Sequence, residues 1–263
     1  MFQNARTDKW WLEPALTATG FLSFVIYTTW RALSGSNFVA ENYLSPFYSP
    51  LLFSAPEYRG IEEGSHHAWF GSWPTIIPEW IPGSPALFIL IFPLSFRMTC
   101  YYYRKFYYRS FFLTPPACSV EGIKQKNYKG ESGLLVIQNL HRYTLYIAIA
   151  YIAILYFDAF HGFFRHGQFG IGVGSIILLL NPTLLAFYTF GCHAFRHLIG
   201  GKEDCFTCPI GNENVQHKMW KKVSILNSKH MLWAWISMIW VALTDLYIML
   251  VANGTIHDWS TWG

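Results

Sequence analysis

Charged residues are scarce in this sequence, and that scarcity excludes an ordinary soluble domain. Only 13% of the 263 residues are Asp, Glu, Lys or Arg, whereas 52% are hydrophobic and 19% are aromatic. A soluble domain typically carries about 25% charged residues. The formal net charge of +4 is small and comes with no nucleic-acid-binding signature, so we expect no nucleic-acid partner. The composition indicates an integral membrane protein.

Motifs for bound redox cofactors are also missing. The five cysteines, Cys100, Cys118, Cys192, Cys205 and Cys208, do not form the closely spaced run of four that an iron–sulfur cluster needs, and no flavin motif is visible. If the chain takes part in electron transfer, another protein must supply the electrons.

The first apolar run is too long for a cleavable signal peptide and lacks a small-residue cleavage site.

Long apolar stretches are what the sequence has instead. Five of them qualify as membrane spans. We therefore predict an all-α integral membrane protein, a single transmembrane domain over residues 1–263 with five helices in a bundle. A long extracytoplasmic loop, rich in Pro, Trp and Tyr, would join the first two helices as an ordered cap. The spans are expected at about residues 11–33, 85–108, 140–160, 170–199 and 230–252.

The basic residues predict the orientation of this bundle. With the N-terminus inside, 16 of the 19 lysines and arginines fall on the cytoplasmic side, and Arg31, Arg59 and Arg165 fall on the other. Cytoplasmic loops carry an excess of Lys and Arg. The predicted topology is N-in and C-out.

The second predicted span ends in an unusual polar stripe. If residues 85–108 form one straight helix, Arg97, Tyr101, Arg104 and Tyr108 stand at i, i+4, i+7 and i+11 and share a face. Arg97 would then lie roughly 10 Å inside the hydrocarbon boundary. An arginine there costs up to about 2.5–3.5 kcal/mol on insertion scales, which makes it a functional candidate. The alternative is an interfacial belt of snorkelling side chains.

A second set of polar residues lies at the end of the fourth predicted span. His193 and His197 stand at i and i+4 with Arg196 beside them, and the glutamate of a zincin motif is absent. Apolar walls with Tyr, His and Arg donors suit a lipid-soluble ligand with polar oxygens, such as a quinone. We assign Tyr101 and Arg104 to hydrogen bonds with the carbonyl oxygens and His197 to proton supply.

Haem binding is an alternative to quinone binding for these polar residues. Two axial histidines would have to come from facing helices, and the first two predicted spans contain none. On the cytoplasmic side, haem b could be held by a pair drawn from His141, His193, His197 and His230. No other metal site is expected.

Three segments carry a family resemblance: the run from Arg97 to Cys118, the triplet His141-Arg142-Tyr143, and the segment from Cys192 to Gly201. Together they resemble the membrane-anchor, cytochrome b-like subunit of bacterial succinate dehydrogenase (succinate:quinone oxidoreductase). The likeness is to the five-helix, single-chain form of actinobacteria and some related phyla.

The resemblance implies a multi-pass subunit of the bacterial inner membrane that has no catalytic activity alone. A flavoprotein subunit with FAD and an iron–sulfur subunit would dock on it, and a small extra membrane subunit is possible. It would bind menaquinone or ubiquinone at the cytoplasmic membrane edge, through Arg97, Tyr101, Arg104, Tyr108, His193, Arg196 and His197. The two-haem anchors carry haem ligands on helices that lack histidine in this sequence, so we expect no cofactor in this chain.

Two other functions stay open. The chain could be a pure scaffold for the soluble subunits, or a haem b-carrying anchor or fumarate reductase subunit. Substitution of Tyr101 by Phe separates quinone binding from a scaffold, because it should change quinone turnover in the first case and leave it unchanged in the second.

Overall fold

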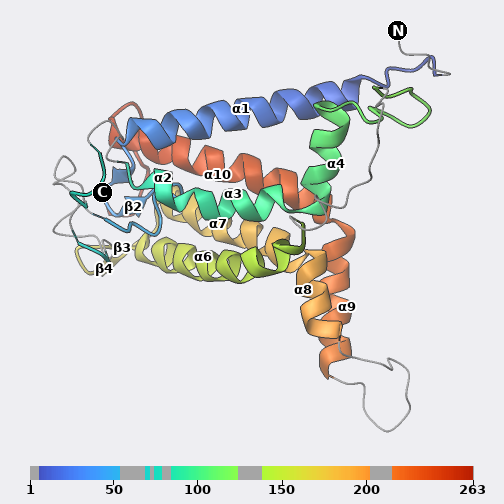
Figure 1. Cartoon of the computed structure of the whole chain (residues 1–263). Coiled ribbons are helices and arrows are strands. Elements are labelled where there is room, and N and C mark those ends of the chain that lie inside the picture. The colour runs from blue at the N-terminus through green and yellow to red at the C-terminus, as the bar shows by residue number, and fades with distance from the viewer. Residues whose placement is uncertain are drawn as a thin grey trace.

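The described part of the chain is mostly helical. The computed structural model describes residues 6–53, 69–71, 74–78, 84–123, 138–201 and 215–262. Four long helices run side by side, with two shorter ones, α2 (Ala86–Ile89) and α3 (Ile91–Met98), along them (Figure 1). The long helices are α1 (Leu12–Ser34), α6 (His141–His161), α7 (Val173–Phe190) and α10 (His230–Ala252).

The two ends of this bundle differ. At one end α4 (Tyr101–Ser110), α8 (His193–Gly200) and α9 (Val215–Ser228) lie across the helix axes (Figure 1). We call this the crossed end; the N-terminal residues lie there, and the C-terminus lies at the opposite end. That opposite end, the hairpin end, carries two short antiparallel pairs: β1 (Val39–Ala40) with β2 (Tyr43–Leu44), and β3 (Phe164–Arg165) with β4 (Gln168–Phe169).

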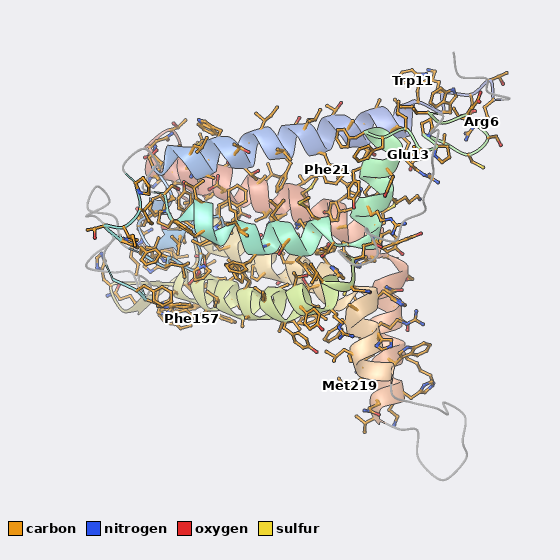
Figure 2. The ribbon with its side chains drawn as sticks, viewed as in Figure 1. Arg6, Trp11, Glu13, Phe21, Phe157 and Met219 are labelled. Atoms are coloured by element: carbon orange, nitrogen blue, oxygen red, sulfur yellow. The ribbon has the colours of Figure 1, made fainter. Side chains whose placement is uncertain are left out.

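The helices agree with a membrane protein. Among the described residues, α6, α7 and α10 are long and apolar enough to cross a membrane, and α2–α3 with α4 adds a fourth if that bent pair is one span. Phe157 of α6 points outward and is half exposed, whereas Phe21 points from α1 into the bundle (Figure 2). Helix α10 begins and ends at the predicted residues, and α1 and α6 are each displaced by one residue.

The predicted straight helix over residues 85–108 is wrong. The chain bends by 83° between α3 and α4, because Cys100 takes an extended conformation (φ −70°, ψ 133°). At about 1.5 Å per residue, Ala86–Met98 covers only about 20 Å of a hydrocarbon layer about 30 Å thick. A straight continuation would carry α4 along the axis of the span and would remove its Arg and Lys side chains from water. The bend avoids this desolvation. It also packs Tyr103 and Phe106 of α4 against Phe21, with ring centroids 5.2 and 6.3 Å away.

The predicted helix over residues 170–199 is also wrong at its end. Helix α7 stops at Phe190, and α8 starts after Gly191 and Cys192. A Cβ on Gly191 would lie 2.7 Å from the carbonyl oxygen of Phe187, so the turn requires glycine. Cys192 is extended, and its Sγ accepts a hydrogen bond from the Phe195 amide at 3.3 Å. The residues from His193 to Gly200 therefore form a separate crosswise helix.

The predicted long loop between α1 and α2 is described only in part. Its beginning lies against the bundle at the hairpin end, where Tyr43, Phe47 and Tyr48 are buried and Phe38 stacks on Tyr48. Residues 54–68, 72–73 and 79–83 lie outside the described part, as do Cys205 and Cys208.

Buried carboxylates hold the hairpin end together. Arg31 of α1 donates from Nε to Asp245 of α10 at 2.6 Å, and the two side chains are 1% and 0% exposed. Asp245 also accepts hydrogen bonds from the hydroxyls of Tyr27 and Ser45. Burying these two charges carries a desolvation penalty of several kcal/mol per ion, which their mutual attraction and the additional hydrogen bonds to Asp245 offset.

Candidate functional site

A cavity of about 520 Å³ opens at the crossed end, where α4, α6, α8 and α10 meet. Its volume falls in the range of small-molecule sites. We call it the polar cavity because most of its lining side chains are polar. They are Thr99, Cys100, Tyr101, Tyr102, Gln138, Asn139, His141, Arg142, Cys192, His193, Ala194, His197, Asn227 and His230.

His141, the first residue of α6, is held in a fixed orientation beside the cavity. Its Nδ1 lies 3.0 Å from the hydroxyl oxygen of Thr99, within hydrogen-bonding distance. Its ring stacks on Phe96 with 4.5 Å between centroids and 9° between planes. The bond and the stack leave Nε2 as the nitrogen available to a ligand.

His230, the first residue of α10, faces the same cavity. It is 2% exposed, stacks on Tyr188 at 5.0 Å, and its Nε2 lies 3.7 Å from the Cys100 sulfur. Among the described residues, its Nδ1 has no hydrogen-bond partner. Buried polar atoms are normally bonded, so this nitrogen is suited to a ligand or a water molecule.

Three of the seven predicted site residues line the polar cavity: Tyr101, His193 and His197. The two histidines face the same way, as their i, i+4 spacing predicts. Arg104 reaches the border of the cavity, because it donates a hydrogen bond to Gln138. Its guanidinium lies 5.5 Å from the ring centroids of both Tyr101 and Tyr108. Tyr101, Arg104 and Tyr108 therefore share one face of α4.

Arg97 and Arg196 do not lie with the residues of the polar cavity. The predicted stripe of four residues is wrong for Arg97, because the bend after α3 turns it away from the other three. Arg196 lies 4.4 Å from the ring centroid of Trp220 in α9 and is not among the residues that line the cavity.

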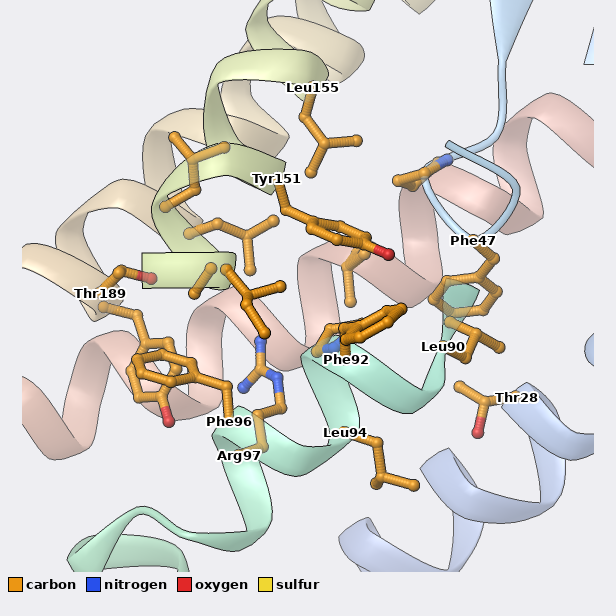
Figure 3. Close-up of a pocket in the computed structure, with 18 of the residues that line it drawn as sticks. Thr28, Phe47, Leu90, Phe92, Leu94, Phe96, Arg97, Tyr151, Leu155 and Thr189 are labelled. Carbon is orange, nitrogen blue, oxygen red and sulfur yellow. The ribbon is translucent and has the colours of Figure 1, made fainter. Parts of the chain in front are cut away.

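Arg97 instead reaches into a second cavity of about 150 Å³ inside the bundle (Figure 3). We call this the apolar cavity; among the described residues that line it, Arg97 is the only charged one. Arg97 donates hydrogen bonds to the hydroxyls of Tyr103 and Ser237 and to the carbonyl oxygen of Ala234. These bonds tie α3 to α4 and α10 and satisfy a cation that would otherwise be costly in hydrocarbon.

One layer of side chains separates the two cavities. Phe96 and Tyr188 line the apolar cavity, and each stacks on a histidine of the polar cavity. Arg97 joins this layer, with its guanidinium 4.9 Å from the Tyr188 ring centroid.

The polar cavity contains side-chain types that bind metals. Imidazoles and thiols, here those of His141, His230, Cys100 and Cys192, are ligands of zinc and of iron–sulfur clusters. Within the part of the chain that the structure describes, no three His, Cys, Asp or Glu side chains are grouped to hold a metal ion. The four histidines that were named as alternative haem b ligands, His141, His193, His197 and His230, all line this cavity.

Sequence reasoning missed several residues of the cavity, including Thr99, Cys100, Gln138, Cys192 and Asn227. Thr99, Cys100 and Cys192 enter it because both predicted helices break at these residues, whereas Gln138 precedes α6 and Asn227 lies in α9. Neither Thr99-Cys100 nor its flanks contain a proline or glycine that would mark the first break. Gly191 was a usable signal for the second one. Cys192 is buried there, and burial raises the pKa of its thiol to about 11.

The comparisons with known proteins agree with the resemblance predicted from the sequence. A chain of the structure described as "Mycobacterium smegmatis Sdh1 complex in the apo form" is 44% identical, with a TM-score of 0.84 over 97% of this chain and 92% of that one. No curated protein matches. The family model described as "Actinobacterial succinate dehydrogenase subunit SdhC" matches residues 12–254. The chain belongs to this SdhC family and is the membrane subunit of a succinate dehydrogenase.

Proposed function

We propose that the chain anchors the flavoprotein and iron–sulfur subunits of succinate dehydrogenase and that its polar cavity binds the headgroup of a quinone. The observation that carries the proposal is the cavity itself. Four histidines and two tyrosines line one space at the end of the membrane-spanning helices. Such a position is accessible both to a lipid-soluble ligand and to protons from water.

The basic residues support the N-in, C-out topology, in which the crossed end faces the soluble subunits. Among the described residues of this end are Arg104, Lys105, Arg109, Arg142, Arg196, Lys218, Lys221, Lys222 and Lys229. By the positive-inside rule, the crossed end faces the cytoplasm and the chain lies in the bacterial inner membrane. Counting α1 and the bent pair as spans gives five crossings in a single domain, with the hairpin end outside.

The reaction proposed for the polar cavity is the reduction of a bound quinone. Reduction of a quinone adds two electrons and two protons and yields a quinol. The electrons come from the iron–sulfur subunit, which receives them from the FAD of the flavoprotein. Tyr101 and the fixed imidazole of His141 donate hydrogen bonds to the carbonyl oxygens, and His193 and His197 supply protons from the cytoplasmic side.

The other predicted residues act indirectly in this proposal. Arg104, between the rings of Tyr101 and Tyr108, holds the Tyr101 side chain and adds positive charge beside the cavity. Arg97 fixes the bend between α3 and α4, which determines where Tyr101 lies. Arg196 belongs to the packing of α8 on α9. Menaquinone and ubiquinone both carry the carbonyl pair that these donors would bind.

The test is Tyr101→Phe in the assembled complex, with Tyr146→Phe as the matched control. Tyr146 is exposed on α6 and does not line the cavity. We expect Tyr101→Phe to keep the subunits assembled and succinate oxidation with an artificial acceptor intact, but to raise the KM for quinone or lower turnover severalfold. Unchanged quinone kinetics in both variants would favour the pure scaffold, whose quinone contacts come from the iron–sulfur partner.

A haem b-carrying anchor or fumarate reductase subunit is the remaining alternative. A reduced-minus-oxidised absorption spectrum of the purified complex addresses it. Bands at b-type haem positions would favour a haem-carrying anchor and make His141, His193, His197 and His230 the ligands to substitute. A flat spectrum in that region supports direct transfer from a cluster of the partner subunit to quinone.

A further inference from the structure

Helices α8 and α9 form a two-helix arm that leaves the bundle sideways at the crossed end (Figure 1). The arm is well packed. Gly200 allows close contact with Trp220, since a Cβ there would lie 2.4 Å from Trp220 Cδ1. The guanidinium of Arg196 lies over the same indole, 4.4 Å from its ring centroid. At the root of the arm, Asn227 donates from Nδ2 to the carbonyl oxygen of Gly191 at 2.8 Å.

The position of the arm relative to the membrane follows from α10. Helix α9 ends at Ser228 and α10, a candidate span, begins at His230, so the root of α9 lies at the end of a membrane-crossing segment. From there the 14 residues of α9 run across the bundle axis instead of continuing along it (Figure 1). A helix of this length extends about 21 Å. It therefore runs along the membrane surface.

One face of α9 combines exposed apolar and basic side chains. Val215, Met219 and Ile225 are 68%, 47% and 70% exposed. At 100° per residue, Lys218 and Lys222 fall on the same side of the helix, and both are exposed. Trp220 and Ser224, on the opposite side, are partly buried, and Val223, at the border between the two sides, is buried. Figure 2 shows Met219 on the arm, well away from the body of the bundle.

We propose that this face of α9 lies in the headgroup region of the bilayer and binds anionic phospholipids. The apolar side chains would enter the acyl boundary. Lys218 and Lys222, which lie between them on the same face, would extend their charged ends upward to the phosphates while their methylene chains stay in the apolar layer. A protein partner suits the face less well, because lysine is depleted in the buried part of protein interfaces. This binding is separate from quinone reduction and does not depend on it.

The test uses the complete complex in nanodiscs of phosphatidylcholine, with and without phosphatidylglycerol. Hydrogen–deuterium exchange of peptides from residues 215–228 reports the protection of α9. We expect the anionic lipid to slow exchange there. The double variant Lys218→Gln/Lys222→Gln should lose this response, since each lysine contributes roughly fivefold to surface affinity and two contribute about thirtyfold. Raising the salt concentration should weaken the response of the native complex.

Lys9→Gln is the matched control, because Lys9 is exposed at the same end of the bundle but lies outside the arm. It should leave the response of α9 intact. Exchange that is equal in both lipid compositions would overturn the proposal. So would protection of α9 in detergent that disappears when the iron–sulfur subunit is removed, because a protein partner would then be what covers this face.

Discussion

The two ends of the bundle use polar side chains in opposite ways. At the hairpin end three buried carboxylates are bonded to neighbouring side chains. Asp245 bonds Arg31, Asp158 accepts from Ser49, and Asp258 accepts from Tyr43 at 2.7 Å. At the crossed end the histidines, tyrosines and cysteines surround a cavity of about 520 Å³.

The difference shows where polar groups stabilise the fold and where they are free to bind. Polar groups that form hydrogen bonds with one another stabilise the fold. Polar groups that line a cavity can form hydrogen bonds with a ligand. Substitutions at the hairpin end should therefore affect assembly and stability, whereas substitutions at the crossed end should affect quinone kinetics.

The largest effect is expected from Asp245→Ala at the hairpin end. It leaves the guanidinium of Arg31 buried without its carboxylate, which typically costs about 3–5 kcal/mol. We expect a lower Tm of the purified complex and less assembled enzyme, with unchanged quinone KM in what remains. Removal of both charges in Arg31→Met/Asp245→Leu should recover much of the loss. The control Glu13→Ala removes an exposed carboxylate; a drop in Tm no larger than in this control would contradict a structural role.

A large kinetic effect is expected from His197→Gln at the crossed end. General acid catalysis contributes roughly 10²–10⁴-fold, so we expect turnover with quinone to fall at least about tenfold while succinate oxidation with an artificial acceptor persists. His257→Gln, at an exposed position of the hairpin end, should have no effect on either rate. Equal quinone turnover in the two variants would mean that His197 does not deliver protons.

A smaller effect is expected from Thr99→Val, which removes the hydroxyl 3.0 Å from His141 Nδ1. The loss of one such bond corresponds to about 1 kcal/mol, or roughly fivefold in kcat/KM for quinone. The matched control is Thr28→Val, whose hydroxyl bonds the carbonyl oxygen of Phe24 beside the apolar cavity. If the two variants lower kcat/KM equally, the orientation of His141 is not what matters.

The smallest change is expected at Cys192. Because burial raises its pKa to about 11, the thiol stays protonated at pH 8, and the reactive thiolate forms only as the pH approaches that value. Iodoacetamide at pH 8 should modify the exposed Cys118 and leave Cys192 unmodified, as read by mass spectrometry of the two peptides. Rapid alkylation of Cys192 in the folded complex would contradict the burial of its thiol.

The straight spans were predictable from the sequence, and the crosswise helices were not. Helix α10 matches its predicted bounds because an apolar run has one low-energy arrangement in a membrane. The bend at Thr99-Cys100 depends on what surrounds it: Tyr103 and Phe106 gain contacts with α1, and Arg97 gains bonds with α10. Hydrophobic periodicity does not report such contacts.

The candidate site was predicted in part for the same reason. Local spacing correctly placed His193 beside His197 and Tyr101 beside Arg104, since both pairs lie within one helix. It failed for Arg97, which lies across the bend, and for Arg196, whose partner Trp220 lies in a helix that was not predicted. Residues contributed by a second helix, such as His230 and Asn227, depend on tertiary packing.

The most direct test of the central proposal is photo-crosslinking of the assembled complex with a photoreactive quinone, with crosslinked residues identified by mass spectrometry. We predict adducts on residues of the polar cavity, such as Tyr101, Tyr102 and His141, that disappear in the presence of excess unlabelled quinone. Competed adducts confined to the apolar cavity, at residues such as Phe92 and Leu94, or to the iron–sulfur subunit alone, would contradict it.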